Sequence, residues 1–336
     1  MRVRYLLGVA LFLALGLAAC NGSEPEQPVQ ENWEVVLKDL PGALASVWGT
    51  GPDDICTVGA DGGLEVGPLV YHYDGIEWQR MDTGQSGDLW WVFGFPGGPV
   101  FMGGSGGMIL RFHDGEFERM TTPSTATVYG IWGTAQNDLW AVGGHASSGA
   151  FAWHFDGGTW SPAEGFPQDV VQYASLFKLT GRSAEDIWMV GTGGVALHYD
   201  GQRFERASSG TDRTLFTVHA DAERFVAVGG FGSGVLVENI GDGWKDVTPS
   251  GALHAIGVYL TGNGEGYAVG VDGSVLRRDG NAWKSVDTGI NIVEAFHGVW
   301  VDSEGGVWAV GGQVLAPPLV DGIMVYRPPD GGETTP

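Results

Sequence analysis

The sequence predicts an all-β chain folded as a seven-bladed β-propeller, and two recurring features carry this prediction. A short apolar segment that ends in glycine, best preserved at residues 139–143, occurs seven times along the 336 residues. Its glycines stand at positions 59, 103, 143, 191, 229, 270 and 311, spaced by 44, 40, 48, 38, 41 and 41 residues. In most copies an Asp-Gly pair and then an aromatic residue follow. A period near 42 residues, with short apolar segments between glycine turns, is the size of one four-stranded propeller blade.

Each repeat is expected to begin with a strand that is apolar on both faces. These inner strands cover residues 44–49, 89–94, 128–133, 176–181, 215–220, 255–260 and 296–301. A strand without a polar face fits a sheet that is packed between two neighbouring sheets. When the strands are aligned on Val47 and its equivalents, the preceding position is mostly small, as crowding around an axis requires. Trp91 and Lys178 are the exceptions.

The other three strands of a blade follow in order. A short polar turn, such as residues 52–54, leads into the strand that ends in glycine. The third strand ends in Asp-Gly, as at Asp74 and Asp156, which is a strong hairpin signal. The outer strand opens with an aromatic residue such as Trp78 and carries charged side chains such as Arg80. Charge on an edge strand opposes pairing with other sheets, so these residues have a structural explanation.

The seventh repeat lacks its outer strand, because the sequence ends shortly after Asp330. At the other end of the chain, residues 33–37 resemble an outer strand that has no hairpin before it. We therefore expect this N-terminal segment to pair with the seventh blade and close the ring. Closure by a strand from the far terminus joins the first and last blades without leaving an open end.

Composition restricts the partners of the protein. Forty acidic residues against 17 basic ones give a formal net charge of −23. Such a field repels phosphate backbones and anionic membrane surfaces, so we expect no nucleic-acid partner. Cations, basic proteins and neutral sugars remain compatible with it. The 58 glycines follow no three-residue period, which excludes collagen and suits many tight turns. We expect one propeller domain over residues 33–332, and a monomer.

The first 20 residues resemble a bacterial lipoprotein signal peptide with a lipobox. Arg2 and Arg4 precede an apolar run over residues 6–17, which is too short to span a bilayer comfortably, and small residues then lead to Cys20. The resemblance implies that Cys20 becomes the lipidated first residue of the mature protein. An ordinary cleaved signal peptide is the alternative.

A lipidated Cys20 would tether the protein to the bacterial cell envelope. Asn21 stands where an inner-membrane retention signal would carry aspartate, so we expect the outer membrane and leave its side open. Residues 21–32 are acidic, contain proline and carry few large apolar groups, which predicts an extended tether. Cys56 would then have no disulfide partner, and we expect it to be a buried apolar thiol.

No motif for catalysis or metal binding stands out in the sequence. His72, His154 and His198 occupy equivalent positions in different repeats, so they cannot converge on one zinc ion and are explained by repeat packing. Residues 103–107 carry the letters of a nucleophile elbow, but no helix follows them. The acidic turns lack the alternating oxygen ligands of a calcium site. We therefore expect no metal ion, no cofactor and no catalytic residue.

The repeat resembles the blades of sialidase-type (BNR-like) propellers and their relatives. These include bacterial secreted proteins with Trp-Ala-Val-Gly and Asp-Gly-x-x-Trp blades, some of them similar to photosystem assembly factors. The two motifs stand here at residues 140–143 and 156–160, and the resemblance covers about residues 33–332. It implies a propeller fold. A sialidase Asp-box has a spacer between Asp and Gly that Asp156 lacks, so the resemblance does not imply sialidase activity.

A rigid ring with variable loops and no recognisable catalytic set is typical of a binding protein. We therefore expect a noncatalytic binding or scaffold module for an envelope protein or polysaccharide. Its binding surface should lie on the turns between second and third strands and on the connections between blades. One of four histidines that lie in or near inner strands and loops could reach a channel mouth, and these are His145, His219, His254 and His297. The candidate ligand-binding residues are Trp91, Lys178, Phe231, His145, Asp61, Asp272 and Asp321.

Two alternatives stay open at this point. A carbohydrate-active enzyme, either a glycosidase or a lyase, would need two carboxylates that face each other across a pocket. The loop acids that could supply such a pair are Asp61, Glu65, Asp169, Asp272, Glu294 and Asp321. An assembly factor for another envelope complex would differ from the binding module only in the identity of its partner.

Overall fold

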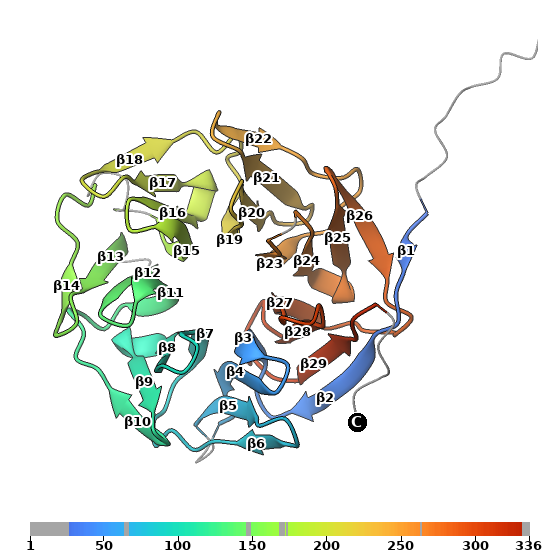
Figure 1. The fold of residues 1–336 in the computed structure, drawn as a ribbon, viewed down its shortest axis with the longest axis horizontal. Helices are drawn as coiled ribbons and strands as arrows, with labels where there is room; N and C mark the ends of the chain where they lie inside the picture. The colour runs from blue at the N-terminus through green and yellow to red at the C-terminus, as the bar shows by residue number, and fades with distance from the viewer. Residues whose placement is uncertain are drawn as a thin grey trace, which may run out of the picture.

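Seven small sheets surround a central axis in the computed structural model, which describes residues 27–63, 67–145, 149–167, 172, 174–262 and 264–330 (Figure 1). The chain is therefore an all-β, seven-bladed propeller, as the sequence predicted. Within the described ranges, no helix has the length and apolar character needed to cross a membrane. The predicted signal segment with Cys20, and residues 21–26 of the predicted tether, lie outside the described residues.

Within each blade the strands run from the axis to the rim in chain order, except where the N-terminal strands are added. Blades one to three comprise β3 (Leu44–Gly51), β4 (Asp54–Asp61), β5 (Pro68–Tyr73), β6 (Trp78–Arg80); β7 (Leu89–Gly94), β8 (Val100–Gly104), β9 (Ile109–His113), β10 (Glu116–Arg119); and β11 (Thr127–Ala135), β12 (Asp138–His145), β13 (Gly149–Phe155), β14 (Trp160–Pro162). Blades four and five comprise β15 (Leu176–Ser183), β16 (Asp186–Gly191), β17 (Ala196–Tyr199), β18 (Phe204–Ala207); and β19 (Leu215–Ala220), β20 (Phe225–Gly229), β21 (Val235–Asn239), β22 (Trp244–Asp246).

Blades six and seven each contain one strand from the N-terminal part of the chain. Blade six comprises β23 (Ala255–Leu260), β24 (Gly266–Gly270), β25 (Val275–Asp279), β26 (Ala282–Asp287) and β1 (Val29–Gln30). Blade seven comprises β27 (Ala295–Val301), β28 (Val307–Gly312), β29 (Gly322–Arg327) and β2 (Glu34–Leu40). Among the described residues, three short 3-10 turns link second and third strands: η1 (Ser105–Gly107), η2 (Thr192–Gly194) and η3 (Val271–Gly273).

Apolar side chains fill the space between neighbouring blades. In β12, Val142 packs with Leu176 and Leu179 of blade four, whereas the adjacent Ala141 packs with Phe101 of blade two. Successive side chains of a strand point to opposite faces, so each sheet contributes to two core layers. The prediction that these strands are apolar on both faces because both faces are buried is therefore confirmed.

Three equivalent hydrogen-bonded ladders explain the repeated histidines. In blade three, Thr134 donates to Asp138, whose carboxylate lies 2.7 Å from Nε2 of His154, and the His154 ring packs 4.7 Å from that of Trp140. Burial raises the pKa of Asp138, but the hydrogen bonds from His154 and Thr134 outweigh it and leave this pKa below its ordinary value. The equivalent pairs are His72 with Asp54 at 2.7 Å and His198 with Asp186 at 2.9 Å.

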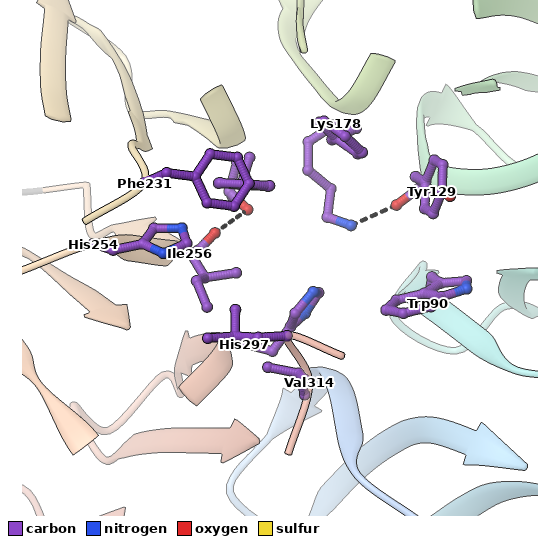
Figure 2. A pocket seen from close by; sticks show the side chains of 12 residues that line it. Trp90, Tyr129, Lys178, Phe231, His254, Ile256, His297 and Val314 are labelled. Atoms are coloured by element: carbon purple, nitrogen blue, oxygen red, sulfur yellow. Dashed lines mark hydrogen bonds between the residues drawn. The ribbon is translucent and has the colours of Figure 1, made fainter. Parts of the chain in front are cut away.

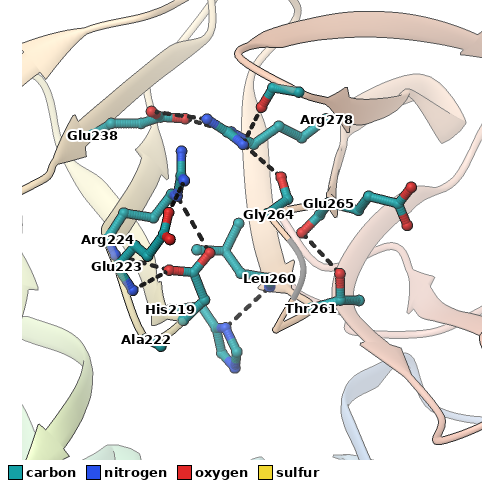
Figure 3. A network of polar contacts seen from close by, with 12 residues as sticks. His219, Ala222, Glu223, Arg224, Glu238, Leu260, Thr261, Gly264, Glu265 and Arg278 are labelled. Atoms are coloured by element: carbon teal, nitrogen blue, oxygen red, sulfur yellow. Dashed lines mark hydrogen bonds and ion pairs between the residues drawn. The ribbon is translucent and has the colours of Figure 1, made fainter.

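A buried ion pair joins blades five and six (Figure 3). Arg278 in β25 is only 1% exposed, and its Nε donates to Oε1 of Glu238 in β21 at 2.8 Å. The same guanidinium donates to the carbonyl groups of Gly264 and Gly280, and Nε1 of Trp283 donates to Glu238 at 3.1 Å. Loss of either charged partner would leave the other buried and unpaired, so this pair restricts how the two blades can meet.

The register of blade two differs by one residue from the sequence prediction. Leu89 of β7 pairs with Gly104, in the place that the other blades give to the terminal glycine of the repeat. The sequence alignment had assigned that role to Gly103, and this assignment was wrong. The two glycines are adjacent, so the pattern of apolar residues alone could not show which of them ends the repeat.

The N-terminal strand closes the ring, as predicted. In blade seven, β2 pairs antiparallel with β29, with Glu34 opposite Tyr326 and Val35 opposite Val325 (Figure 1). The segment before it is also attached to the ring. Val29 and Gln30 form β1, which pairs in parallel with β26 and adds a fifth strand to blade six. The structured part of the chain therefore begins before residue 33, inside the segment expected to be a tether.

Glu31 connects this N-terminal segment to two blades. The residue is 8% exposed, and its carboxylate accepts hydrogen bonds from Nε1 of Trp33 at 3.1 Å and from the hydroxyl of Tyr267 at 3.1 Å. It also accepts one from Arg277 of blade six at 2.9 Å, and Nε of Arg327 in blade seven lies 3.8 Å away. One buried carboxylate thus holds the last two blades together at the closure.

Replacing Glu31 should destabilise the ring strongly. We expect Glu31→Ala to lower the free energy of unfolding by about 3 kcal/mol, because Arg277 and Arg327 would lose a buried charge partner. Guanidinium unfolding followed by tryptophan fluorescence measures the change. Glu116→Ala, on the exposed outer strand β10, is the matched control and should change stability by less than about 0.5 kcal/mol. Equal losses in the two variants would contradict this role of Glu31.

Candidate binding site at the mouth of the central channel

Every inner strand carries the same irregularity. In each of the seven blades, the pairing between the first and second strands skips one residue of the inner strand. The skipped residues are Ala45, Trp90, Tyr129, Phe177, Phe216, Ile256 and His297. Such a β-bulge leaves one residue unpaired and changes the direction of its side chain. The seven bulges lie at equivalent positions, and all of these side chains except Ala45 line one pocket at one end of the central axis, which is called the channel mouth.

The glycine that marks each repeat lies against this bulge. Gly311, for example, pairs with Phe296, the residue before the bulged His297. A Cβ atom on Gly311 would lie 2.0 Å from the carbonyl oxygen of Ala295, and the corresponding distances in the seven blades run from 1.9 to 2.3 Å. No side chain fits in that space. The recurring glycine is therefore required by the close approach of the chain that leads into each inner strand.

The bulged aromatic side chains contact one another around the axis. The ring centroids are separated by 5.9 Å for His297 and Trp90, 5.8 Å for Trp90 and Tyr129, 5.3 Å for Tyr129 and Phe177, and 5.4 Å for Phe177 and Phe216. In blade one the bulged residue is Ala45, which leaves His297 and Trp90 to meet across it. Aromatic pairs of this kind add about 0.5–1.5 kcal/mol each beyond burial, so the channel mouth has a well-ordered apolar lining.

This lining encloses a pocket of about 210 Å³ (Figure 2). Its wall is completed by Phe231, Val314 and Leu315, which lie between second and third strands, and by His254, which precedes β23. Phe231 and Leu315 are 68% and 59% exposed, so they form the rim. An apolar, aromatic hollow with a few polar groups has the composition of a ligand site.

Among the described residues that line the pocket, Lys178 is the only lysine or arginine. It is 4% exposed, its amine donates to the carbonyl oxygen of Tyr129, and its Nζ lies 4.4 Å from the ring centroid of Trp91. Burial lowers the pKa of Lys178 to about 7. Trp91 and Lys178 are the two large residues at a position that is small in the other inner strands, and they therefore contact each other across Gly130 of blade three. Trp91 is not among the residues that line the pocket, but its ring contacts the amine of Lys178.

Two of the four histidines considered from the sequence line the pocket. Nδ1 of His297 donates to the carbonyl oxygen of Ala45 at 2.6 Å, and burial, with a smaller effect of the charge on Lys178, lowers the His297 pKa to about 4. His254 is 4% exposed, burial lowers its pKa, and its Nε2 has no hydrogen-bond partner among the described residues.

His219 does not line this pocket. Its Nδ1 accepts a hydrogen bond from the backbone N–H of Leu260 at 3.0 Å, and burial lowers its pKa to about 4 (Figure 3). Because an accepting Nδ1 carries no proton, this bond and the burial both favour the neutral imidazole.

Three of the predicted loop acids gather beside the pocket. Asp272, Glu294 and Asp321 line a second hollow of about 260 Å³, which shares Val314 and Leu315 with the first. These acids come from blade six, from the connection to blade seven and from blade seven itself. In the described part of the chain, no group of three or more His, Cys, Asp or Glu residues is arranged to hold a metal ion.

The remaining predicted residues lie elsewhere. The Asp61 carboxylate accepts hydrogen bonds from the backbone N–H groups of Gly63 at 3.1 Å and Gly87 at 2.8 Å, so it ties blade one to the connection that follows it. The prediction for His145 concerns a side chain outside the described structure, as do those for Glu65 and Asp169. Cys56 is buried, and burial together with the charge of Asp54 raises its pKa to about 12, as expected for an unreactive thiol.

Sequence reasoning missed three members of the aromatic lining, namely Tyr129, Phe177 and Phe216. A signal for them was present. The position two residues before the aligned valine is aromatic in four of the seven repeats, although it lies next to a position that is mostly small. It was not singled out because an aromatic residue in an apolar strand is more often part of the core.

Comparison with known proteins identifies the fold. A scan against protein-family models and a search among curated proteins both find no match. Among solved structures, YCF48 bound to D1 peptide matches with a TM-score of 0.67 and 14% identity, over 89% of this chain and 98% of that one. Virginiamycin B lyase from Staphylococcus aureus matches with a TM-score of 0.69 and 12% identity, over 88% and 100%. The WD40 propeller of Doa1 matches with a TM-score of 0.66 and 13% identity, over 89% and 98%. At these identities the similarity shows a shared propeller fold alone.

The neutral histidines should make stability depend on pH. The pKa of His297 lies at about 4 in the folded protein and at its ordinary 6.5 when unfolded, so only the unfolded chain binds this proton between those values. The contribution of neutral His297 to the free energy of unfolding is therefore complete above about pH 6.5, and it falls as the pH drops towards about 4. We expect His297→Asn to reduce the number of protons taken up on unfolding near pH 5 by about one. The slope of unfolding free energy against pH measures this number, and an unchanged slope would contradict the assignment.

Proposed function

We propose that the protein is a noncatalytic binding module that takes an apolar side chain of a partner protein into the pocket at the channel mouth. The observation that carries this proposal is the ring of bulged side chains, which surrounds a hollow of about 210 Å³. A binding pocket built on rigid strands loses little freedom when a ligand enters, which favours affinity.

The surface around the pocket supports a protein partner. Seven large hydrophobic side chains are exposed among the described residues, and four of them, on loops of blades five to seven, line the two hollows or directly precede a lining residue. These four are Phe231, Leu253, Val293 and Leu315, with exposed fractions of 68, 43, 74 and 59%. Apolar side chains that gather around a hollow mark an interaction surface. The net charge of −23 favours a basic segment as the partner.

The similar structures are consistent with this use of the fold but do not decide it. One of them is YCF48 with a bound D1 peptide, whereas another is virginiamycin B lyase. Propellers of this shape therefore serve both binding and catalysis. The choice for this chain depends on its own residues, and the described residues of the aromatic lining include no carboxylate.

The proposal includes a lipid anchor at Cys20 and a location in the bacterial cell envelope, at the outer membrane. Its support is the basic, apolar and small-residue pattern of residues 1–20. Residues 21–28 would then form a short spacer between the lipid and β1. A polysaccharide is the second kind of partner that such a location would offer, since neutral sugars are compatible with the acidic surface.

A carbohydrate-active enzyme is the second candidate, because Asp272, Glu294 and Asp321 line one hollow, which shares Val314 and Leu315 with the aromatic pocket. Paired carboxylates are the catalytic groups of most glycosidases. Incubation of the protein with envelope polysaccharide tests this candidate. If the wild-type protein produces shortened sugar chains and the Asp321→Asn variant does not, the result would favour the enzyme over the binding module.

Affinity capture from native envelope, with residues 21–336 as bait, tests the proposed function. We expect a reproducible protein partner whose affinity falls about thirtyfold in Phe231→Ala, because an exposed aromatic side chain that becomes buried at the centre of an interface is a typical hot spot. Ile76→Ala is the matched control, since Ile76 is 84% exposed on the hairpin between β5 and β6 of blade one. Equal capture by both variants, or capture of polysaccharide alone, would contradict the proposal.

Replacing Cys20 tests the anchor. We expect Cys20→Ser to move the protein from the membrane fraction to the soluble fraction of the envelope, because a serine cannot receive the thioether-linked lipid. Fractionation followed by immunoblotting measures the shift. Asn21→Ser is the control and should remain with the membrane. A Cys20→Ser variant that stays fully membrane-bound would leave the lipidation proposal without support.

A further inference from the structure

The aromatic pocket contains two polar groups whose hydrogen-bonding capacity the fold leaves partly unused. An ammonium group has three N–H donors. In the described structure Lys178 donates to the carbonyl oxygen of Tyr129 and otherwise lies over the ring of Trp91. Nε2 of His254 is buried without any hydrogen-bond partner among the described residues. Both residues line the pocket and lie on different sides of it (Figure 2).

Lys178 also lacks a carboxylate partner within the described part of the chain. The titratable groups that share the pocket with its amine are Tyr129, His254 and His297, and none of them is an acid that ionises at neutral pH. The acids of the neighbouring hollow are not among the residues that line this pocket, although the two hollows share Val314 and Leu315. A buried cation without a counter-ion is costly unless something else compensates it. The pocket therefore has an unmet preference for a negative charge at its floor.

We propose that the pocket binds an apolar carboxylate, with the hydrocarbon or aromatic body among the rings and the carboxylate on Lys178. The inference rests on the proposed function, because it names the ligand chemistry of the same pocket. The anion has two sources that share this chemistry, a free apolar acid and the C-terminal carboxylate of a partner segment that ends in an apolar residue.

The size of the pocket suits this class of ligand. An apolar cavity of about 150 Å³ is large enough to bind benzene. The pocket here measures about 210 Å³, so one aromatic ring with a short acid chain fits inside it. Trp90, Phe177 and Phe216 supply ring faces and edges for that body, and the exposed Phe231 can cover it from the rim.

The charge state of Lys178 gives the binding a characteristic pH dependence. Burial places the Lys178 pKa at about 7, so the amine is partly neutral at that pH. A bound carboxylate favours the protonated amine and raises this pKa, so binding near pH 7 takes up about half a proton. Affinity then falls by up to about tenfold per pH unit above about pH 7. The lowered pKa values of His254 and His297, and the raised pKa of Tyr129, keep those groups neutral just above pH 7.

Calorimetric titration with 3-phenylpropionate and its neutral amide tests the inference. On the whole protein we expect the acid to bind at least about tenfold more tightly than the amide near pH 7, and to lose that advantage as the pH rises. Titrations in two buffers of different ionisation enthalpy measure the proton uptake. Lys178→Met should abolish the preference for the acid, whereas Lys245→Met, on the exposed outer strand β22, should retain it.

The outcomes separate this inference from the proposed function. Equal binding of acid and amide, or acid binding without proton uptake in the wild-type protein, overturns the carboxylate site even if Lys178→Met fails to fold. Failure of 3-phenylpropionate, its amide and a short peptide that ends in Phe to bind overturns it as well. The proposed function is judged by partner capture with Phe231→Ala, so it can stand or fall on its own.

A second pair of probes distinguishes the two sources of the anion. A short peptide that ends in Phe is compared with the same peptide carrying a C-terminal amide. Preference for the free carboxylate peptide over both the amidated peptide and 3-phenylpropionate supports a partner's chain terminus. Preference for 3-phenylpropionate over both peptides supports a small organic acid. Each result supports the carboxylate site, and indifference to the terminal charge of every probe overturns it.

Discussion

Close packing of each repeat glycine against a carbonyl oxygen of the incoming chain governs the channel mouth. The space for a side chain at Gly143 is already occupied by the carbonyl oxygen of Thr127, and the same contact recurs in the other blades. This contact places the connection from the previous blade directly against the second strand. The inner strand accommodates one extra residue as a result. The bulge that results turns one side chain of every blade towards the axis. A local steric constraint, repeated seven times, thus produces the aromatic lining.

The fold could be predicted from the sequence because its signals are local. Asp-Gly hairpins, apolar strands and the terminal glycine each act within a few residues, and their spacing gives the blade number directly. The bulges could not be read in the same way, since a bulged aromatic and a core aromatic look alike in an apolar strand. Trp91 and Trp90 illustrate the difficulty. The sequence singled out Trp91 for breaking the small-residue pattern, but the adjacent Trp90 is the one that lines the pocket.

Ring closure depends on a strand that the sequence predicts and on a buried ionic contact that the sequence does not predict. The strand that begins at Glu34 was recognisable because the seventh repeat lacked an outer strand. The attachment of Glu31 to the last two blades was not recognisable, because an acidic residue in a polar, proline-containing segment is typical of a solvated tether. Its partners Arg277 and Arg327 lie about 250 to 300 residues further along the chain, and only the completed ring brings them together. Buried ionic contacts of this kind follow from tertiary structure and leave no local pattern.

Lys178 is the clearest departure of the site from what the fold alone requires. At the equivalent position the other blades carry small residues in five cases, and Trp91 in the sixth. Burying an amine costs free energy, and the lowered pKa of Lys178 expresses that cost directly. The fold partly compensates it with the carbonyl group of Tyr129 and the ring of Trp91, which orient the amine without neutralising it. The net charge of −23 raises no obstacle at short range, because a charge inside an apolar pocket responds mainly to its nearest neighbours. An amine held in this way contributes little to stability. Its position in the pocket is instead explained by recognition of a negative charge.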